Sequence, residues 1–150
     1  LFSFNLFPIQ EAITKNCDIR FTTLLQRRSM TRLATLMAKD NDRTALVTGE
    51  NLGQVASQTL PGMSVVDPVT DLIILRPLIT YDKTEIIDLA RKFGTYEKSI
   101  EPFEDCCTVF VAKHPKTNPT LEQVLEEESK INYIEIEQEI FEKRESYKIK

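Results

Sequence analysis

The sequence predicts an α/β fold built on a parallel, doubly wound sheet. Short apolar runs that end at Gly or Pro alternate with segments of helical periodicity, and this strand–helix alternation is typical of such sheets. The chain has 150 residues, of which 41% are hydrophobic, so it is long enough and apolar enough to bury one core. The fold class therefore follows from the order of the expected elements.

The expected strands are short. Extended chain is predicted for segments 2–8, 44–48, 63–66 and 72–78. Helices are predicted for segments 9–15, 23–39, 52–60, 82–93, 120–129 and 133–147. The helix from Asp82 begins with a capping box completed by Glu85, and Gly94 is a suitable residue just past its end. Residues 95–118 show few regular signals, and long irregular connections in compact domains are often functional.

Composition limits the partners and the compartment. The net charge is −4, whereas a domain that grips nucleic acid alone usually carries a basic excess. No apolar run approaches the roughly 20 residues of a membrane span. Three cysteines, two of them adjacent, make no disulfide framework, and with one histidine we expect no metal site. The chain is expected to be cytoplasmic.

Gly49 directly follows an expected buried strand. A glycine there lets a ligand approach the backbone because no Cβ stands in the way. Free N–H groups at a following helix start would suit phosphate or adenine nitrogens. The alternative is an ordinary strand-to-helix turn, and spacing alone does not exclude it.

Cys106 and Cys107 lie in the irregular stretch. Accessible thiols that can ionise serve in catalysis, and Lys113 and His114 could lower a thiol pKa while neighbouring acids would raise it. The alternative is a pair of small hydrophobic residues under a loop.

Three arginines, Arg27, Arg28 and Arg32, lie on the helix expected at 23–39. They could bind polyphosphate or an RNA backbone, or they could form a solvated helix face.

Several segments, in order, resemble the tRNA 4-thiouridine synthetase family of sulfurtransferases. They are Leu46–Thr59, Arg76–Arg91, Gly94-Thr95 and Glu104–Pro115. The resemblance implies a PP-loop (adenine-nucleotide α-hydrolase-like) domain, incomplete at its N-terminal side. On this basis, residues 1–131 would be the C-terminal portion of that domain, and residues 132–150 a charged C-terminal helix. The chain opens on Leu1 inside an expected strand, so we expect the protein to continue upstream.

The family chemistry is ATP-dependent sulfur transfer to uridine 8 of tRNA. The resemblance implies that ATP, with Mg²⁺, adenylates the uridine O4, and that a cysteine desulfurase loads a persulfide onto an enzyme cysteine. Matched by position, Arg27, Gly49 and Gln58 would contact the nucleotide. Cys107 would carry the persulfide, and Cys106 could be the resolving thiol. Sulfur supply for thiamine thiazole synthesis is a further implied role.

The family's Ser-Gly-Gly-x-Asp-Ser phosphate loop is absent from the chain, so we expect these residues alone to be inactive. An exposed sheet edge would favour a homodimer. Two rival functions remain open. One is another PP-loop ATP pyrophosphatase, which explains the segment 48–59 but not the paired cysteines. The other is a non-catalytic remnant that binds nucleotide or a partner protein.

Overall fold

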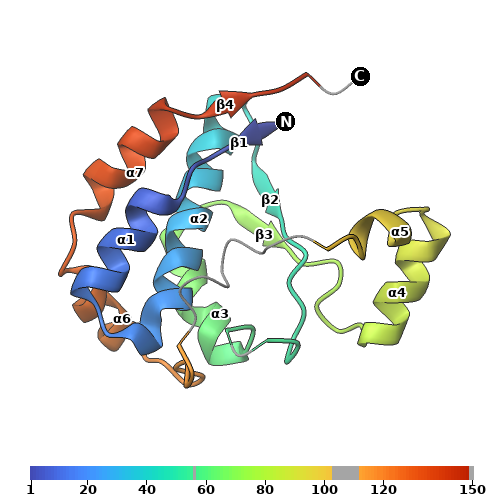
Figure 1. Ribbon diagram of the computed structural model, residues 1–150, viewed down its shortest axis with the longest axis horizontal. Coiled ribbons are helices and arrows are strands. Elements are labelled where there is room, and N and C mark those ends of the chain that lie inside the picture. The colour runs from blue at the N-terminus through green and yellow to red at the C-terminus, as the bar shows by residue number, and fades with distance from the viewer. Residues whose placement is uncertain (56, 103–111, 149–150) are drawn as a thin grey trace.

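The computed structural model describes residues 1–55, 57–102 and 112–148, and it confirms a mixed α/β fold (Figure 1). Helices surround two small sheets. The helices are α1 (Phe7–Asn16), α2 (Thr22–Asp40), α3 (Leu60–Val66), α4 (Lys83–Lys92), α5 (Tyr96–Ser99), α6 (Leu121–Glu128) and α7 (Tyr133–Glu142), with short 3-10 turns at Ile19–Phe21 and Asp67–Val69. The strands are β1 (Phe2–Ser3), β2 (Ala45–Val47), β3 (Ile73–Leu75) and β4 (Glu145–Ser146).

The parallel pair β2–β3 is the predicted parallel element of the fold. Ala45 lies opposite Ile73, and Val47 lies opposite Leu75. The ladder continues one residue further, because the backbone N–H of Thr48 donates to the carbonyl of Leu75 at 3.0 Å. Both strands therefore end together, and the two loops that follow them emerge at the same edge of the sheet.

The hydrophobic core lies around α2, with α1, α6 and α7 packed against it. Its buried side chains come from helices far apart in the sequence: Ile9, Ile13, Phe21, Leu24, Leu25, Leu33, Val65, Val124 and Ile140. Burying each such aliphatic chain stabilises the fold by about 1.5–3 kcal/mol. No helix in the described part of the chain is both long enough and apolar enough to span a membrane.

The C-terminal segment packs on the same core. The helical part of the segment 132–150 ends at Glu142, and β4 follows it. β4 pairs antiparallel with β1, and the backbones of Leu1 and Tyr147 exchange hydrogen bonds at 2.8 and 2.9 Å. The N-terminal strand and the C-terminal strand thus lie side by side (Figure 1).

Two expected elements are wrong. The segment 52–60 forms turns rather than a helix in its described residues, and the segment 63–66 is helical rather than extended. The reason lies at the start of α3. Thr59 accepts a hydrogen bond from the backbone N–H of Gly62 at 3.0 Å, and Pro61 occupies the first turn, where its missing N–H is not needed.

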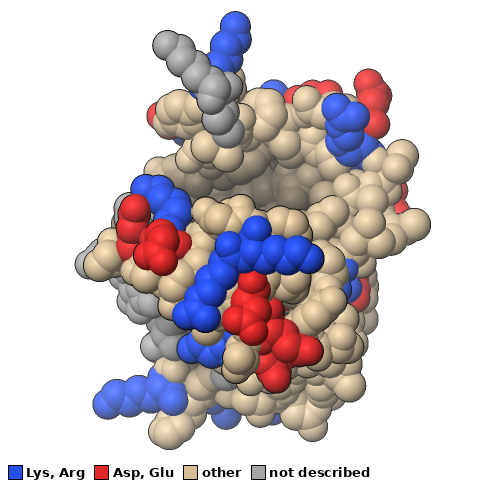
Figure 2. Space-filling view, turned by 90° about the vertical axis from the view of Figure 1, so that its right-hand side faces the viewer, with Lys and Arg blue, Asp and Glu red and all other residues tan. Residues whose placement is uncertain are grey.

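The predicted capping of α4 is confirmed. Asp82 and Glu85 form a reciprocal capping box, and Gly94 adopts a positive φ of 70° just past the helix. None of the residues of α4 is buried, and α4 and α5 project from the helical body (Figure 1). Seen from that side, the molecule is hollowed, and the walls of the hollow are mainly uncharged (Figure 2).

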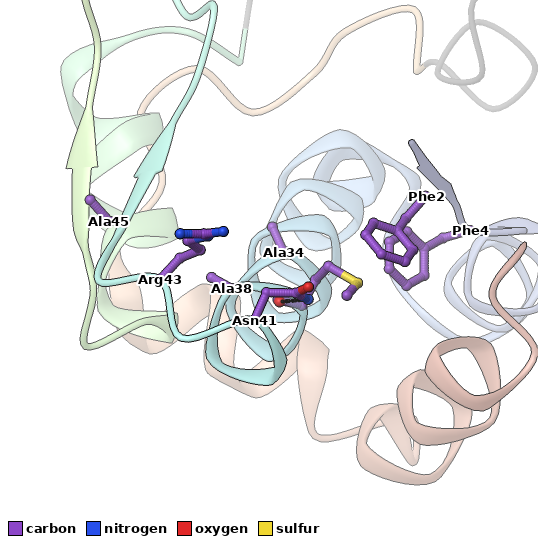
Figure 3. A pocket seen from close by; sticks show the side chains of 8 residues that line it. Phe2, Phe4, Ala34, Ala38, Asn41, Arg43 and Ala45 are labelled. Atoms are coloured by element: carbon purple, nitrogen blue, oxygen red, sulfur yellow. Dashed lines mark hydrogen bonds between the residues drawn. The ribbon is translucent and has the colours of Figure 1, made fainter. Parts of the chain in front are cut away.

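A pocket of about 510 Å³ lies between α2 and the two sheets. The rings of Phe2 and Phe4 form one side of it, Arg43 and Ala45 lie opposite, and α2 lies between (Figure 3). None of the residues predicted to contact nucleotide lines this pocket. It is an open, largely apolar surface at the edge of β2.

Candidate functional site at the carboxyl end of the parallel strands

The three residues predicted to contact nucleotide meet at one loop. The loop follows β2 and runs from Gly49 to the start of α3. Arg27 reaches it from α2: its Nη1 donates to the carbonyl of Ser57 at 2.6 Å, and its Nη2 pairs with the carboxylate of Glu50. Gln58 closes the loop from the other end, because its side-chain oxygen accepts from the backbone N–H of Asn51 at 3.2 Å.

Gly49 lies at the tip of β2, where the backbone is open. A Cβ added there would meet no atom of the described residues within 4 Å, and Gly49 does not need a positive φ. Glycine is therefore not required by packing or by backbone conformation at this position. Its absent side chain leaves space beyond the carboxyl end of the strand, where ligands bind in open α/β sheets.

The loop after β3 is tied to the same place by Asn51. This asparagine is 4% exposed, and its Nδ2 donates to the carbonyl of Leu78 at 2.7 Å and also to that of Tyr81. The backbone N–H of Leu52 donates to the carbonyl of Ile79 at 3.1 Å. These bonds hold the two loops together, so the edge is a built surface rather than two independent turns.

A chain of charges runs along this edge. Glu50 pairs through one oxygen with Arg27 and through the other with Nε of Arg76, at 2.6 Å. Arg76 in turn pairs with Asp67. The side chains of Arg27, Glu50 and Arg76 are only 13–15% exposed, so water screens these ion pairs less than it would at an open surface. Sequence reasoning did not single out Glu50, Asn51 or Arg76, although the first two follow an expected strand and Arg76 lies in an expected extended segment.

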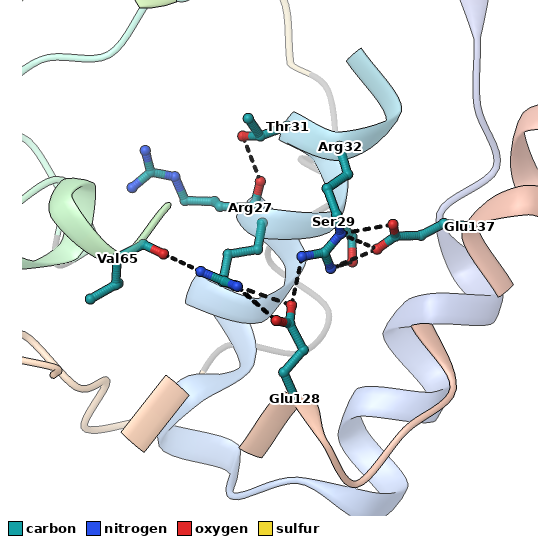
Figure 4. A network of polar contacts seen from close by, with 8 residues as sticks. Arg27, Ser29, Thr31, Arg32, Val65, Glu128 and Glu137 are labelled. Atoms are coloured by element: carbon teal, nitrogen blue, oxygen red, sulfur yellow. Dashed lines mark hydrogen bonds and ion pairs between the residues drawn. The ribbon is translucent and has the colours of Figure 1, made fainter. Parts of the chain in front are cut away.

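Arg28 and Arg32 have neither of the roles considered for them. Arg28 is buried, Arg32 is partly buried with its side chain 15% exposed, and both pair with Glu128 of α6 (Figure 4). Arg28 also donates to the carbonyl of Val65, and Arg32 pairs with Glu137 of α7 at 2.7 Å. Two arginines and two glutamates therefore balance within the helical body, which excludes a solvated face and leaves Arg27 as the arginine at the loop.

The two cysteines predicted to act in catalysis, Cys106 and Cys107, lie outside the described residues. The chain that follows them is anchored beside the candidate site. Ala112 is buried, and the carbonyl of Thr117 accepts a hydrogen bond from the hydroxyl of Thr59 at 2.8 Å. Lys113 and His114 are exposed. Among the described residues no group of His, Cys, Asp and Glu could hold a metal ion.

Cys17 is a half-buried thiol beside α6. Burial, and then the negative charge of Glu127, raise its pKa to about 11. Its sulfur lies 3.3 Å from the carbonyl of Glu127. A thiol with this pKa stays protonated near pH 7 and is a poor nucleophile.

Sequence comparison assigns the family. A family profile described as "Thiamine biosynthesis protein (ThiI)" matches residues 1–133. The chain belongs to the ThiI family. Members of the family that resemble it include a probable tRNA sulfurtransferase of Finegoldia magna, 53% identical over 149 residues, which cover 99% of the chain and 38% of that relative. Another is a probable tRNA sulfurtransferase of Alkaliphilus oremlandii, 53% identical over 132 residues, covering 88% of the chain and 34% of the relative.

A solved structure confirms the expected fold type. The crystal structure of a 4-thiouridine synthetase–RNA complex with bound ATP superposes with a TM-score of 0.91 at 37% identity. The match covers 97% of the chain and 38% of that structure. The ThiI-family chain described here thus spans a little over a third of the length of the proteins it resembles.

Proposed function

We propose that this chain forms the nucleotide-binding edge and the sulfur-carrying segment of an ATP-dependent tRNA sulfurtransferase that makes 4-thiouridine. The observation that carries the proposal is the convergence of Arg27, Gly49 and Gln58 on one loop at the carboxyl end of β2. Their convergence supports a shared ligand, and the structural relative was solved with ATP and RNA bound.

The residues present fit an adenine nucleotide. Space beyond Gly49 admits a ligand to the backbone, and Arg27 brings a guanidinium suited to phosphate oxygens. Gln58 orients the loop through Asn51. ATP, with Mg²⁺, would supply the activation of the uridine O4, which is otherwise a poor leaving group. The chain's own residues would bind the nucleotide, keep the loop in place and present the thiol.

Cys107 would carry the sulfur, delivered by a cysteine desulfurase, and Cys106 would be the resolving thiol. The anchoring of Thr117 beside Thr59 supports this, because the segment after both thiols returns to the nucleotide edge. A role in sulfur supply for thiamine thiazole and a cytoplasmic location are further parts of the proposal. A non-catalytic remnant would not need two adjacent cysteines.

The test is the 4-thiouridine content of bulk tRNA in cells that lack their own enzyme. The cells would express a full-length protein in which this chain is joined to the parts of a relative that it does not cover. We expect Cys107→Ser to abolish 4-thiouridine, and Cys17→Ser, which removes a thiol of high pKa, to leave it unchanged. If Cys106→Ser abolishes 4-thiouridine and Cys107→Ser does not, Cys106 carries the sulfur instead. If neither Cys106→Ser nor Cys107→Ser lowers 4-thiouridine, this transfer mechanism is excluded.

A further inference from the structure

We propose that Glu50 is a positioning residue for Arg27. Its carboxylate bridges Arg27 and Arg76 and so holds the Arg27 guanidinium at the carboxyl end of β2, where it would meet the phosphates of a nucleoside triphosphate. The inference rests on the proposed nucleotide site. It adds a residue whose role is to fix the geometry of another side chain rather than to touch the ligand.

The bridge uses both oxygens of Glu50. Oε1 pairs with Arg27, while Oε2 accepts from Nε of Arg76 at 2.6 Å and from the hydroxyl of Thr48 at 3.0 Å. Thr48 and Arg76 therefore orient the carboxylate independently of Arg27. Arg76 follows β3 and Thr48 follows β2, so the carboxylate is held by the ends of both parallel strands.

Arg27 is thereby gripped between two acceptors. Nη1 donates to the carbonyl of Ser57 at 2.6 Å, and Nη2 pairs with Glu50. An arginine side chain loses much rotamer freedom when it is fixed, and a guanidinium already held in place loses less on binding a ligand. The two contacts come from opposite ends of the loop 49–58, so the loop and the arginine order one another.

Charge alone makes the opposite prediction. Removing the negative charge of Glu50 would leave Arg27 and Arg76 less neutralised, and an anion would be attracted more strongly. If Glu50 acts by positioning, its loss weakens nucleotide binding despite the added positive charge. The sign of the change in affinity therefore separates the two roles.

The experiment measures ATP affinity by isothermal titration, using the protein that joins this chain to the remainder of the relatives' length. Glu50→Gln keeps the shape of the side chain and is expected to raise the Kd for ATP about tenfold. Asp71→Asn is the matched control, because Asp71 is an exposed acid that also pairs with a basic residue of α2, Lys39. It should change the Kd by less than about twofold. An unchanged or lower Kd for Glu50→Gln overturns the inference.

A second variant, Arg76→Lys, tests the bridge without changing Glu50, in case Glu50→Gln disturbs folding. Arg76→Lys keeps the charge but replaces the two nitrogens that hold Glu50 and Asp67 in fixed directions by one ammonium nitrogen, so we expect a smaller rise in Kd, about threefold. Wild-type affinity in Arg76→Lys would show that Arg76 does not orient Glu50 and would count against the bridge.

A double-mutant cycle with Arg27→Gln excludes a general structural effect. If Glu50 acts through Arg27, Glu50→Gln adds no further loss in the Arg27→Gln background. A full additive loss would mean that Glu50 supports the fold instead. If Arg27→Gln weakens ATP binding but Glu50→Gln does not, the inference fails and the proposed site stands. If wild-type protein does not bind ATP, or Arg27→Gln binds it normally, both fail.

Discussion

At the scale of single residues, Glu128 balances the buried Arg28 and the partly buried Arg32. It is 3% exposed and receives hydrogen bonds from Arg28 at 2.7–3.2 Å and an ion pair from Arg32 at 2.8 Å. Removing one partner of a buried ion pair leaves the remaining charge without compensation. Glu128 therefore fixes α6 to α2.

We expect Glu128→Gln to lower the free energy of unfolding by about 3 kcal/mol, because the buried Arg28 would lose its carboxylate partner and the partly buried Arg32 would keep only Glu137. Urea denaturation followed by circular dichroism measures it. Glu126→Gln makes the same change on the exposed side of α6, and its free energy of unfolding should stay within about 0.5 kcal/mol of that of the parent. Equal effects from the two variants would mean that the buried network contributes nothing specific.

The same carboxylate predicts how stability depends on pH. Burial by itself would raise the pKa of Glu128, but hydrogen bonds from Arg28 and the charge of Arg32 outweigh it and lower the pKa below its usual value of 4.5. A carboxyl whose folded pKa is depressed stabilises the fold above its unfolded pKa, and this contribution is lost as the pH falls through the folded pKa.

We therefore expect the stability difference between the parent and Glu128→Gln to be complete at pH 7 and to shrink progressively below about pH 4.5. Urea titrations from pH 7 to pH 3 measure the difference at each pH. A stability difference that stays constant down to pH 3 would contradict a lowered pKa of Glu128.

The arginines show what could and could not be predicted residue by residue. Helical spacing placed Arg27 apart from Arg28, but it could not show which side of α2 is buried against the C-terminal helices. The glutamates that pair with Arg28 and Arg32 come from α6 and α7, about a hundred residues away. Local sequence carries no signal of such pairing, so the buried network was missed.

At the scale of elements, α4 depends on its own ends more than on packing. None of its residues is buried, so its capping box contributes a large share of its stability. We expect Asp82→Ala to lower the local stability of α4 by about 1 kcal/mol, because the backbone N–H of Glu85 loses its acceptor, which lies 2.9 Å away.

Amide hydrogen exchange across α4 measures the loss. Asp82→Asn keeps a capping oxygen and should retain most of the protection. Equal protection in the parent and in Asp82→Ala would show that contacts rather than the cap hold this helix.

The element with strong end signals was predictable, whereas short apolar runs gave mixed results: segments 44–48 and 72–78 contain strands, but segment 63–66 does not. Asp82, Glu85 and Gly94 mark both ends of α4 by chemistry that is local in sequence. The segment 63–66 ends in two β-branched valines, which favour a strand by propensity, yet the cap at Thr59 makes the segment the end of α3. Periodicity over four residues cannot separate these two outcomes.

At the scale of the whole molecule, one face of the β2–β3 sheet is apolar and uncovered. Val47 is 70% exposed, Ile73 is 67% exposed, and β2 has no strand on its other edge within the described part of the chain. The unpaired edge of β2 lies beside the Phe2–Phe4 pocket and, together with this apolar face, can pair with a strand of another chain.

We therefore expect the 150-residue chain by itself to self-associate. Val47→Lys, which places a charge on the exposed edge, should shift it toward monomer in light scattering. Val55→Lys makes the same change at an exposed loop valine and should have no such effect. A monomeric parent chain, or equal behaviour of the two variants, would contradict an association through this edge.

The most direct test of the nucleotide site is Gly49→Val. The structure leaves open space at this position and does not need a positive φ there, so we expect a melting temperature within about 2 °C of the parent. The added side chain would occupy the space through which a ligand reaches the backbone. The measurement is 4-thiouridine in tRNA from cells whose only enzyme is the Gly49→Val protein, and we expect a loss of at least about tenfold. A folded variant that makes 4-thiouridine at the parent level would show that the nucleotide does not bind at the carboxyl end of β2.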